Sequence, residues 1–202
     1  MKILLIVFLV GILVYFLSRR FFMSGNSTAV VRATHRNSFL LVDTSPQVLS
    51  SVSKRTLWTV GIGFILFLII LVLGIKIKII WIALPLSLYL IAQLLVYTNH
   101  VKAVRDQRVY FDPTSNEVWI ERIGGSPIYF NLLQDVKKVT EVKSVQQNRG
   151  VLFGYYELKL HHGHVFIPYL VEQHQHTNNK LFFDRLNQHF SIVLETKLFP
   201  VI

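Results

Sequence analysis

The 202-residue sequence contains no cysteine, which excludes disulfides, thiolate metal ligands and thiol catalysis. Acidic residues are also scarce, because 11 Asp and Glu face 21 Lys and Arg. The carboxylates are scattered singly, and the chain has no His-Glu-x-x-His motif, phosphate-binding loop or Gly-x-Ser-x-Gly frame. These absences remove the common signatures of catalysis. We therefore expect a protein that is not an enzyme and that uses no cofactor.

The chain is very apolar for its length, with a mean hydropathy of +0.46. Three apolar runs account for this, at residues 3–17, 57–75 and 79–98. At about 1.5 Å per residue the second and third runs are each roughly 30 Å long, the thickness of the hydrocarbon core of a bilayer. The linker Lys76-Ile77-Lys78 between them is so short that the two helices must form an antiparallel hairpin. We predict three transmembrane helices.

The first apolar run has two interpretations, a retained anchor and a cleavable signal peptide. A cleavable signal needs small residues after its apolar core, but this core is followed by Ser18-Arg19-Arg20. Two arginines at this position act as a stop that retains the segment in the membrane. The sequence favours an N-terminal transmembrane anchor over residues 1–23.

Positive charge is concentrated beside the apolar runs. Residues 1–99 hold nine Lys or Arg and one Asp, whereas residues 100–202 hold twelve Lys or Arg and ten Asp or Glu. Most of the flanking charge lies between the first and second runs and after the third, which predicts that the loop and the C-terminal domain are cytoplasmic in a multi-pass inner-membrane protein. We expect membrane lipid, and no nucleic acid, as a partner. The predicted membrane-surface residues are Arg19, Arg20, Lys54, Arg55, Lys137, Lys138 and Lys143.

The loop over residues 24–56 is too long for a simple connector. Residues 29–34 and 39–42 are typical of short β-strands around the turn His35-Arg36-Asn37-Ser38. Two alternatives stay open. The loop forms a hairpin that packs on the C-terminal domain, or it is a polar linker that ends in the serine-rich run at residues 50–53.

Residues 100–202 have the composition of a water-facing domain. Short β-prone runs alternate with turn residues from Arg108 onward, which predicts about seven antiparallel strands. Separate strands are expected at residues 151–153 and 155–160, on either side of Gly154. Residues 178–190 carry an apolar stripe that predicts a helix over the open end of the sheet. Residues 192–194 also resemble a strand.

Several short runs of this domain resemble the bacterial pleckstrin-homology-like domains. They are Ile128-Tyr129-Phe130, Val136-Lys137-Lys138-Val139, Gly154-Tyr155-Tyr156-Glu157-Leu158, the turn at Gly163, Ile167-Pro168 and the final helix. The resemblance covers about half of the chain and implies a bent antiparallel sheet capped by a C-terminal helix. Members of this group often carry a membrane hairpin before the domain, as residues 57–99 do here. The first apolar run and the residues after the last helix depart from that arrangement.

Histidines are the best candidates for a binding site, because imidazole nitrogens bind zinc and copper. His162 and His164 lie in one turn on the same strand face, and His174 follows a few residues later. These three residues are the predicted metal ligands. The alternative is a solvated hairpin tip without a metal.

These observations predict a non-enzymatic membrane protein whose cytoplasmic domain binds a protein partner or a second copy of the chain. A contact of the domain with the lipid surface is a variant of this hypothesis. The alternatives are an accessory subunit of a membrane enzyme or transporter, and a histidine-based metal-binding membrane protein.

Overall fold

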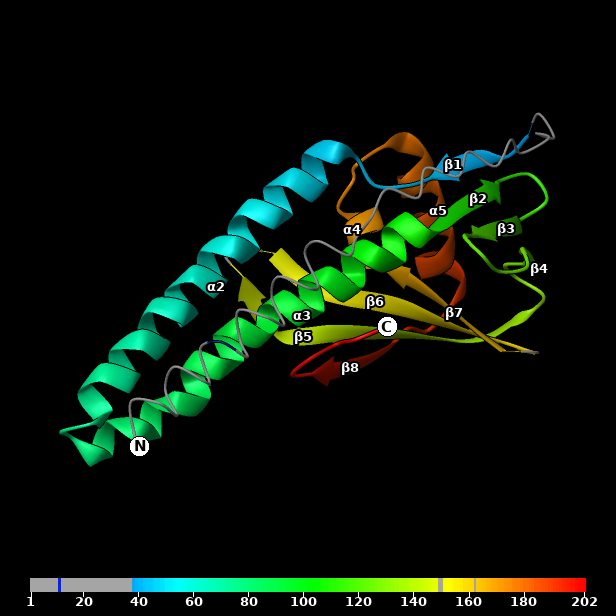
Figure 1. The fold of residues 1–202 in the computed structure, drawn as a ribbon. Helices are drawn as coiled ribbons and strands as arrows, with labels where there is room; N and C mark the ends of the chain where they lie inside the picture. Colours follow the sequence, from blue (N-terminus) through cyan, green and yellow to red (C-terminus); the bar gives the residue numbers. More distant parts are fainter. Residues whose placement is uncertain (1–10, 12–37, 149–150, 162) are drawn as a thin grey trace.

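The computed structural model describes residues 11, 38–148, 151–161 and 163–202 (Figure 1). The predicted first span apart from Gly11, the predicted strand at residues 29–34 and the candidate residues Arg19, Arg20 and His162 lie outside the described residues. The elements in chain order are β1 (Leu40–Val42), α2 (Pro46–Gly74), η1 (Lys78–Ala83), α3 (Leu84–Asp106), β2 (Gln107–Asp112), β3 (Glu117–Arg122), β4 (Ile128–Asn131), β5 (Val136–Asn148), β6 (Val151–Leu160), β7 (Gly163–Pro168), α4 (Tyr169–Glu172), α5 (Thr177–His189) and β8 (Val193–Lys197).

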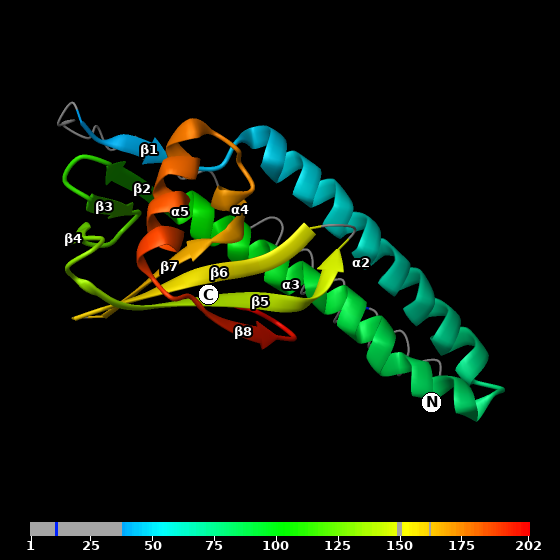
Figure 2. The ribbon, with the colours of Figure 1, turned by 180° about the vertical axis from the view of Figure 1, so that it is seen from behind.

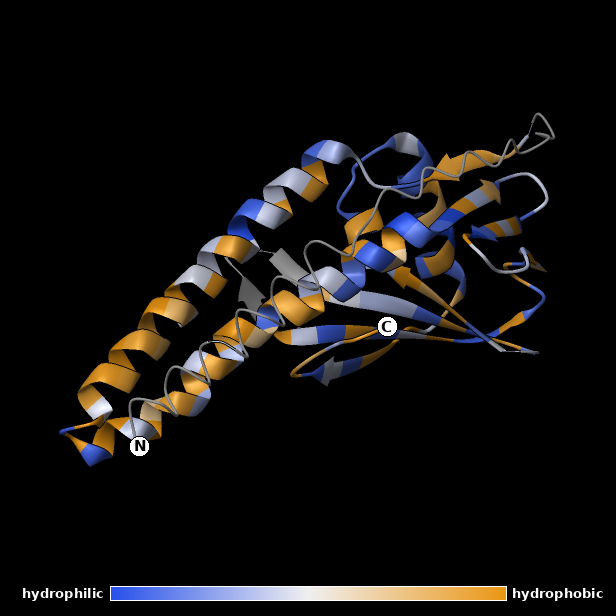
Figure 3. Cartoon of the chain, in the orientation of Figure 1, coloured by the Kyte–Doolittle hydropathy of each residue, from blue (hydrophilic) through white to orange (hydrophobic). Residues whose placement is uncertain are grey.

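Helices α2 and α3 form a long antiparallel pair that extends away from the rest of the protein (Figure 1). Both are long and apolar enough to cross a membrane. The turn between them contains the 3₁₀ helix η1, and the Trp81 indole Nε1 closes it by donating to the Gly74 carbonyl oxygen over 3.0 Å. The predicted hairpin at residues 57–98 is therefore present. Figure 3 shows that hydrophobic residues dominate the parts of both helices near this turn.

Helix α2 begins well before the apolar run at residue 57. Ser45 caps it, since its side-chain oxygen accepts from the Val48 backbone N–H over 3.2 Å, and Pro46 occupies the first turn. The serine-rich run at residues 50–53 is thus helical and is not a linker. The reason is tertiary, because Val52 is buried in the core and Leu49 packs against it. The first turns of α2 belong to the domain.

The first sheet is antiparallel, with the strand order β1-β2-β3-β4. Strand β1 precedes the helical pair and β2 follows it, and Leu41 lies opposite Tyr110. The predicted strand at residues 39–42 is present as β1, over residues 40–42, and of the two alternatives for the loop it is packing on the C-terminal domain that holds for this strand. The helical pair is inserted between two neighbouring strands of one sheet. Helix α3 ends at Asp106 and β2 starts at Gln107, so no linker separates the helix from the sheet.

The second sheet has the order β7-β6-β5-β8. Strands β5, β6 and β7 are antiparallel, whereas β8 runs parallel to β5, with Leu194 opposite Glu141. The predicted strand at residues 192–194 is present as β8. The predicted break at Gly154 is wrong, because β6 continues through Gly154, which pairs with Lys143. A side chain at Gly154 would lie 2.5 Å from the Val142 carbonyl oxygen, so this glycine serves close packing and not a turn.

The main hydrophobic core fills the space between the two sheets and α5 (Figure 2). Helix α5 contributes Phe182, Phe183 and Leu186, and the Phe182 ring contacts the Phe111 ring of β2 edge to face at 5.3 Å. The predicted amphipathic helix at residues 178–190 is confirmed, and its apolar stripe faces the core as expected. The described chain is a mixed α/β protein that combines two apolar helices with two four-stranded sheets.

Candidate interaction surfaces

A row of large apolar side chains crosses the outer face of the first sheet. Alternate residues of a strand face opposite sides, and Phe111 and Ile120 occupy the core side. On the outer side, the residues that lie directly opposite one another across the four strands form a line, with one residue from each strand. We call this line the aromatic row, and it consists of Leu41, Tyr110, Trp119 and Tyr129.

Ring contacts hold the aromatic row together. Tyr110 and Trp119 stack with centroids 5.2 Å apart, and Phe39 meets Trp119 edge to face at 6.4 Å. Leu41 and Tyr129 at the two ends are 41% and 55% exposed, which is high for side chains of this size. Tyr and Trp are the residue types most enriched at protein interfaces.

Charged side chains border the aromatic row. Arg108 pairs across the sheet with Glu121, and the Tyr110 hydroxyl donates to the Glu121 carboxylate over 3.4 Å. Burial, followed by the nearby Glu121 charge, raises the pKa of Tyr110, so the phenol stays protonated and remains a donor at neutral pH. The row thus combines apolar area with one acid and one base on the same strand pair.

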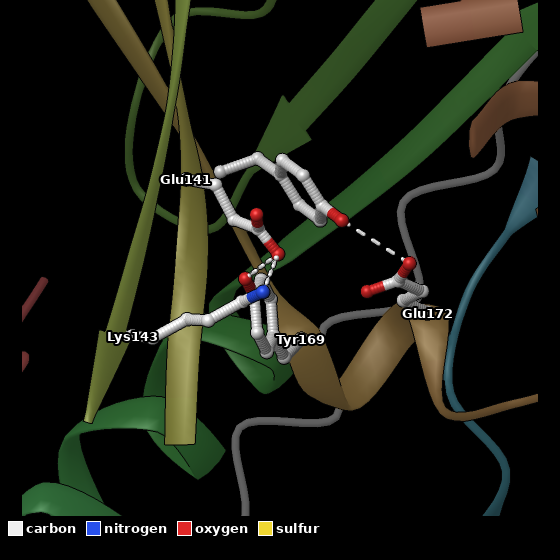
Figure 4. Close-up of polar contacts among 5 residues, drawn as sticks. Glu141, Lys143, Tyr169 and Glu172 are labelled. Carbon is white, nitrogen blue, oxygen red and sulfur yellow. Dashed lines mark hydrogen bonds and ion pairs between the residues drawn. The ribbon is translucent and has the colours of Figure 1, made fainter. Parts of the chain in front are cut away.

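A second polar group joins the second sheet to α4 (Figure 4). The Tyr169 hydroxyl donates to the Glu141 carboxylate, which also forms an ion pair with Lys143 at 2.8 Å. Next to them the Tyr156 hydroxyl donates to Glu172 over 3.1 Å. Burial raises the pKa of Glu172, and burial together with the two carboxylates raises the pKa values of both tyrosines. Because the phenols remain protonated, these contacts are hydrogen bonds that fasten α4 to the sheet.

The structure separates the predicted membrane-surface residues. Lys54 and Arg55 lie on α2 directly before its apolar run. Lys137 and Lys138 are exposed at the start of β5, and Figure 1 shows that this end of the strand is remote from the two helices. This placement argues against a lipid contact for Lys137 and Lys138. The charge of Lys143 is directed to Glu141. Strict alternation would also place Lys137 and Lys143 on one face of the strand, but a bulge between Val136 and Lys138 interrupts it.

The candidate metal ligands have separate partners. His164 Nδ1 lies 2.6 Å from a Glu157 carboxylate oxygen, whereas His174 Nδ1 lies 2.9 Å from the Asp43 carbonyl oxygen. Among the described residues no three His, Asp or Glu side chains gather in a metal-binding group. A metal shared by His162 and His164 stays a prediction, because His162 lies outside the described part of the chain.

Comparison with known proteins finds no family model, no curated protein and no solved structure that matches this chain. The aromatic row could not be predicted from the sequence alone. Its signal was the alternation around Trp119, which marks one face of β3, but the partners of Trp119 on β1 and β4 follow only from the register of the sheet.

Proposed function

We propose that this protein is a membrane-anchored docking protein, in which the α2–α3 hairpin crosses the bilayer and the β-domain binds a protein partner through the aromatic row. The observation that carries the proposal is the exposure of Leu41 and Tyr129 at the two ends of the row, beside the partly exposed Trp119; Tyr110 between them is only 4% exposed. The fold has no packing need for an exposed Tyr129 next to a partly exposed Trp119, whereas a protein interface gains most from such anchors. In this proposal the domain faces the cytoplasm, the first apolar run is a third span, and the protein acts without catalysis.

The location of the aromatic row favours a protein partner over the lipid surface. The first sheet lies at the end of the molecule opposite to the turn between α2 and α3 (Figure 1). Lipid next to the helices is therefore remote from the row, whereas a partner on the water side can reach it.

The rigid connection between the domain and the helical pair supports a docking role. Strand β2 continues α3 without a linker, and the Gln107 side chain donates to the Phe166 carbonyl oxygen of β7 over 2.9 Å. Thr44, just before α2, donates to the Leu170 carbonyl oxygen over 2.7 Å. Both ends of the helical pair are thus fixed to the domain, so its orientation follows that of the helices.

The order of the elements supports a pleckstrin-homology-like assignment of the domain. In the described residues the seven strands β1–β7 are antiparallel to their neighbours in two sheets, and α5 follows them over the core. The insertion of α2 and α3 after β1 and the parallel strand β8 are departures from that pattern.

The test compares single substitutions in the full-length protein, purified from gently solubilised and cross-linked membranes. We expect the wild-type protein to recover a partner in fixed stoichiometry and Trp119→Ala to lose it. Leu181→Ala on α5 is the matched control, because Leu181 is 44% exposed outside the row. Thermal melting by circular dichroism verifies that both variants fold. Equal recovery of the partner by wild type and Trp119→Ala, or purification of the chain alone, would contradict the proposal.

A further inference from the structure

The last five residues of the chain lie against α3. After β8 the chain turns, and the Val201 backbone N–H donates to the Phe199 carbonyl oxygen over 2.9 Å. Asn99 of α3 then holds Ile202 twice, since its amide nitrogen donates to the Ile202 carbonyl oxygen over 3.1 Å and its amide oxygen accepts from the Ile202 N–H over 2.8 Å. His100 Nε2 donates to the Pro200 carbonyl oxygen over 2.7 Å. We call residues 198–202 the tail.

The tail extends beside the apolar part of α3. The Phe199 ring contacts the Tyr89 ring with centroids 5.3 Å apart. Tyr89 precedes Thr98, the end of the apolar run, by nine residues, which corresponds to about 13 Å of helix rise. A contact with Tyr89 therefore places the Phe199 ring alongside the segment that the proposed span buries in lipid.

The tail is apolar and largely uncovered. Its sequence Leu-Phe-Pro-Val-Ile contains no polar side chain. Leu198, Phe199 and Val201 are 59%, 40% and 51% exposed. On α3, which the tail contacts, Leu88 and Leu95 are also exposed. Contiguous exposed apolar surface marks an interaction site or a membrane contact.

The polarity changes sharply just before the tail. Glu195, Thr196 and Lys197 precede it, and the Lys197 ammonium lies 3.4 Å from the Tyr155 hydroxyl and 6.0 Å from the centre of the Tyr155 ring. A lysine and a tyrosine at the border of an apolar segment are typical of the interface between water and lipid.

We propose that the tail inserts into the membrane beside α3, with lipid acyl chains around Leu198, Phe199 and Val201. Residues 198–202 then form a short contact with the bilayer that ties the second sheet to the membrane surface. Asn99 and His100 satisfy the backbone polar groups that water would otherwise bind, which lipid requires of any inserted segment. The inference rests on the proposed crossing of the membrane by α2 and α3.

The absence of cysteine permits a direct test, because any introduced cysteine is unique. An environment-sensitive fluorophore is attached to Leu198→Cys, and the full-length protein is reconstituted alone into phosphatidylcholine vesicles that contain lipids spin-labelled near the top of the acyl chain. Ile69→Cys, at an exposed position of α2, reports on the span, and Asn187→Cys, on the exposed side of α5, reports on water. We expect spin-labelled lipid to quench the fluorophore at residue 198 and at residue 69. The fluorescence at residue 187 should stay unchanged.

The controls separate failure of this inference from failure of the proposed anchoring. Quenching at residue 69 without quenching at residue 198 would overturn the inserted tail and leave the anchoring intact. In that case, quenching of the fluorophore at residue 198 by aqueous iodide would show that water surrounds the tail. Shielding from iodide would show that another protein surface covers the tail. Either result would contradict the inserted tail. Absence of lipid quenching at residue 69 would overturn both the anchoring and the inserted tail.

Discussion

The contact between α2 and α3 at Gly63 gives the sharpest prediction about the helical pair. A methyl group added at Gly63 would lie 2.6 Å from Leu90 Cβ, about 0.8 Å short of the ordinary contact distance of 3.4 Å. It would also lie 3.2 Å from the Ser87 carbonyl oxygen and the Ile91 backbone nitrogen, which cannot rotate away. Gly63→Ala must therefore push the two helix backbones apart.

Gly61 provides a matched control on the same helix. A methyl group added there meets no atom within 4 Å. Both substitutions gain the same helix propensity, about 1 kcal/mol at an interior position. The steric cost of overpacking is about 1–3 kcal/mol and applies to Gly63 alone. We expect Gly63→Ala to be less stable than Gly61→Ala by that amount.

The assay is equilibrium unfolding of the detergent-solubilised protein with increasing SDS, followed by circular dichroism. The difference between the two alanine variants isolates the helix contact, because the propensity gain cancels. Equal unfolding midpoints for Gly61→Ala and Gly63→Ala would refute the close packing of α2 on α3 at this position. Gly63→Leu should destabilise the pair further, since the same neighbours block a larger side chain.

Three further predictions concern the domain. The pKa of Glu172 is raised in the folded state, so folding favours its protonated form. The resulting contribution to the free energy of unfolding is present at low pH and is lost as the pH rises through the folded pKa. Glu172→Gln should therefore flatten the pH dependence of the melting temperature between mildly acidic and neutral pH, and an unchanged profile would contradict the assigned shift. Gly154→Ala should lower the free energy of unfolding by about 1–3 kcal/mol, because its methyl group would meet the Val142 carbonyl oxygen at 2.5 Å, whereas Gly125→Ala, with its nearest neighbour at 3.5 Å, should leave chemical denaturation nearly unchanged. If the histidine turn binds metal, the purified protein should hold one equivalent of zinc or copper that His164→Ala removes; mass spectrometry showing no metal in the wild-type protein would reject that site.

The sequence determines the helical pair more fully than the sheets. Apolar runs of about twenty residues indicate spans regardless of what surrounds them, because the backbone must satisfy its own hydrogen bonds in lipid. The start of α2 was misplaced because its first turns are polar and gain their stability from the contact of Val52 with the domain core. Local polarity cannot report such a contact.

The strand pairing in the sheets could not be predicted, because it joins residues that are far apart in the sequence. The entire helical pair lies between Leu41 and Tyr110 in the sequence, although the two residues pair across the sheet. The local sequence of a short strand does not indicate which distant strand it pairs with. Gly154 resembled a turn residue, although its role is to let Tyr169 approach the strand. The bulge beside Lys137 also reversed the face expected for the following residues, since one extra residue moves every later side chain to the other side.

The most direct test of a membrane-anchored domain is the accessibility of two single cysteines in intact cells. Lys78→Cys lies in the turn between α2 and α3, and Asn187→Cys lies on the exposed side of α5. We predict that a membrane-impermeant maleimide labels residue 78 from outside intact cells and labels residue 187 only after the membrane is opened. Labelling of both cysteines from the same side would contradict the crossing of the membrane by the helical pair, and the reverse pattern would contradict the cytoplasmic orientation of the domain.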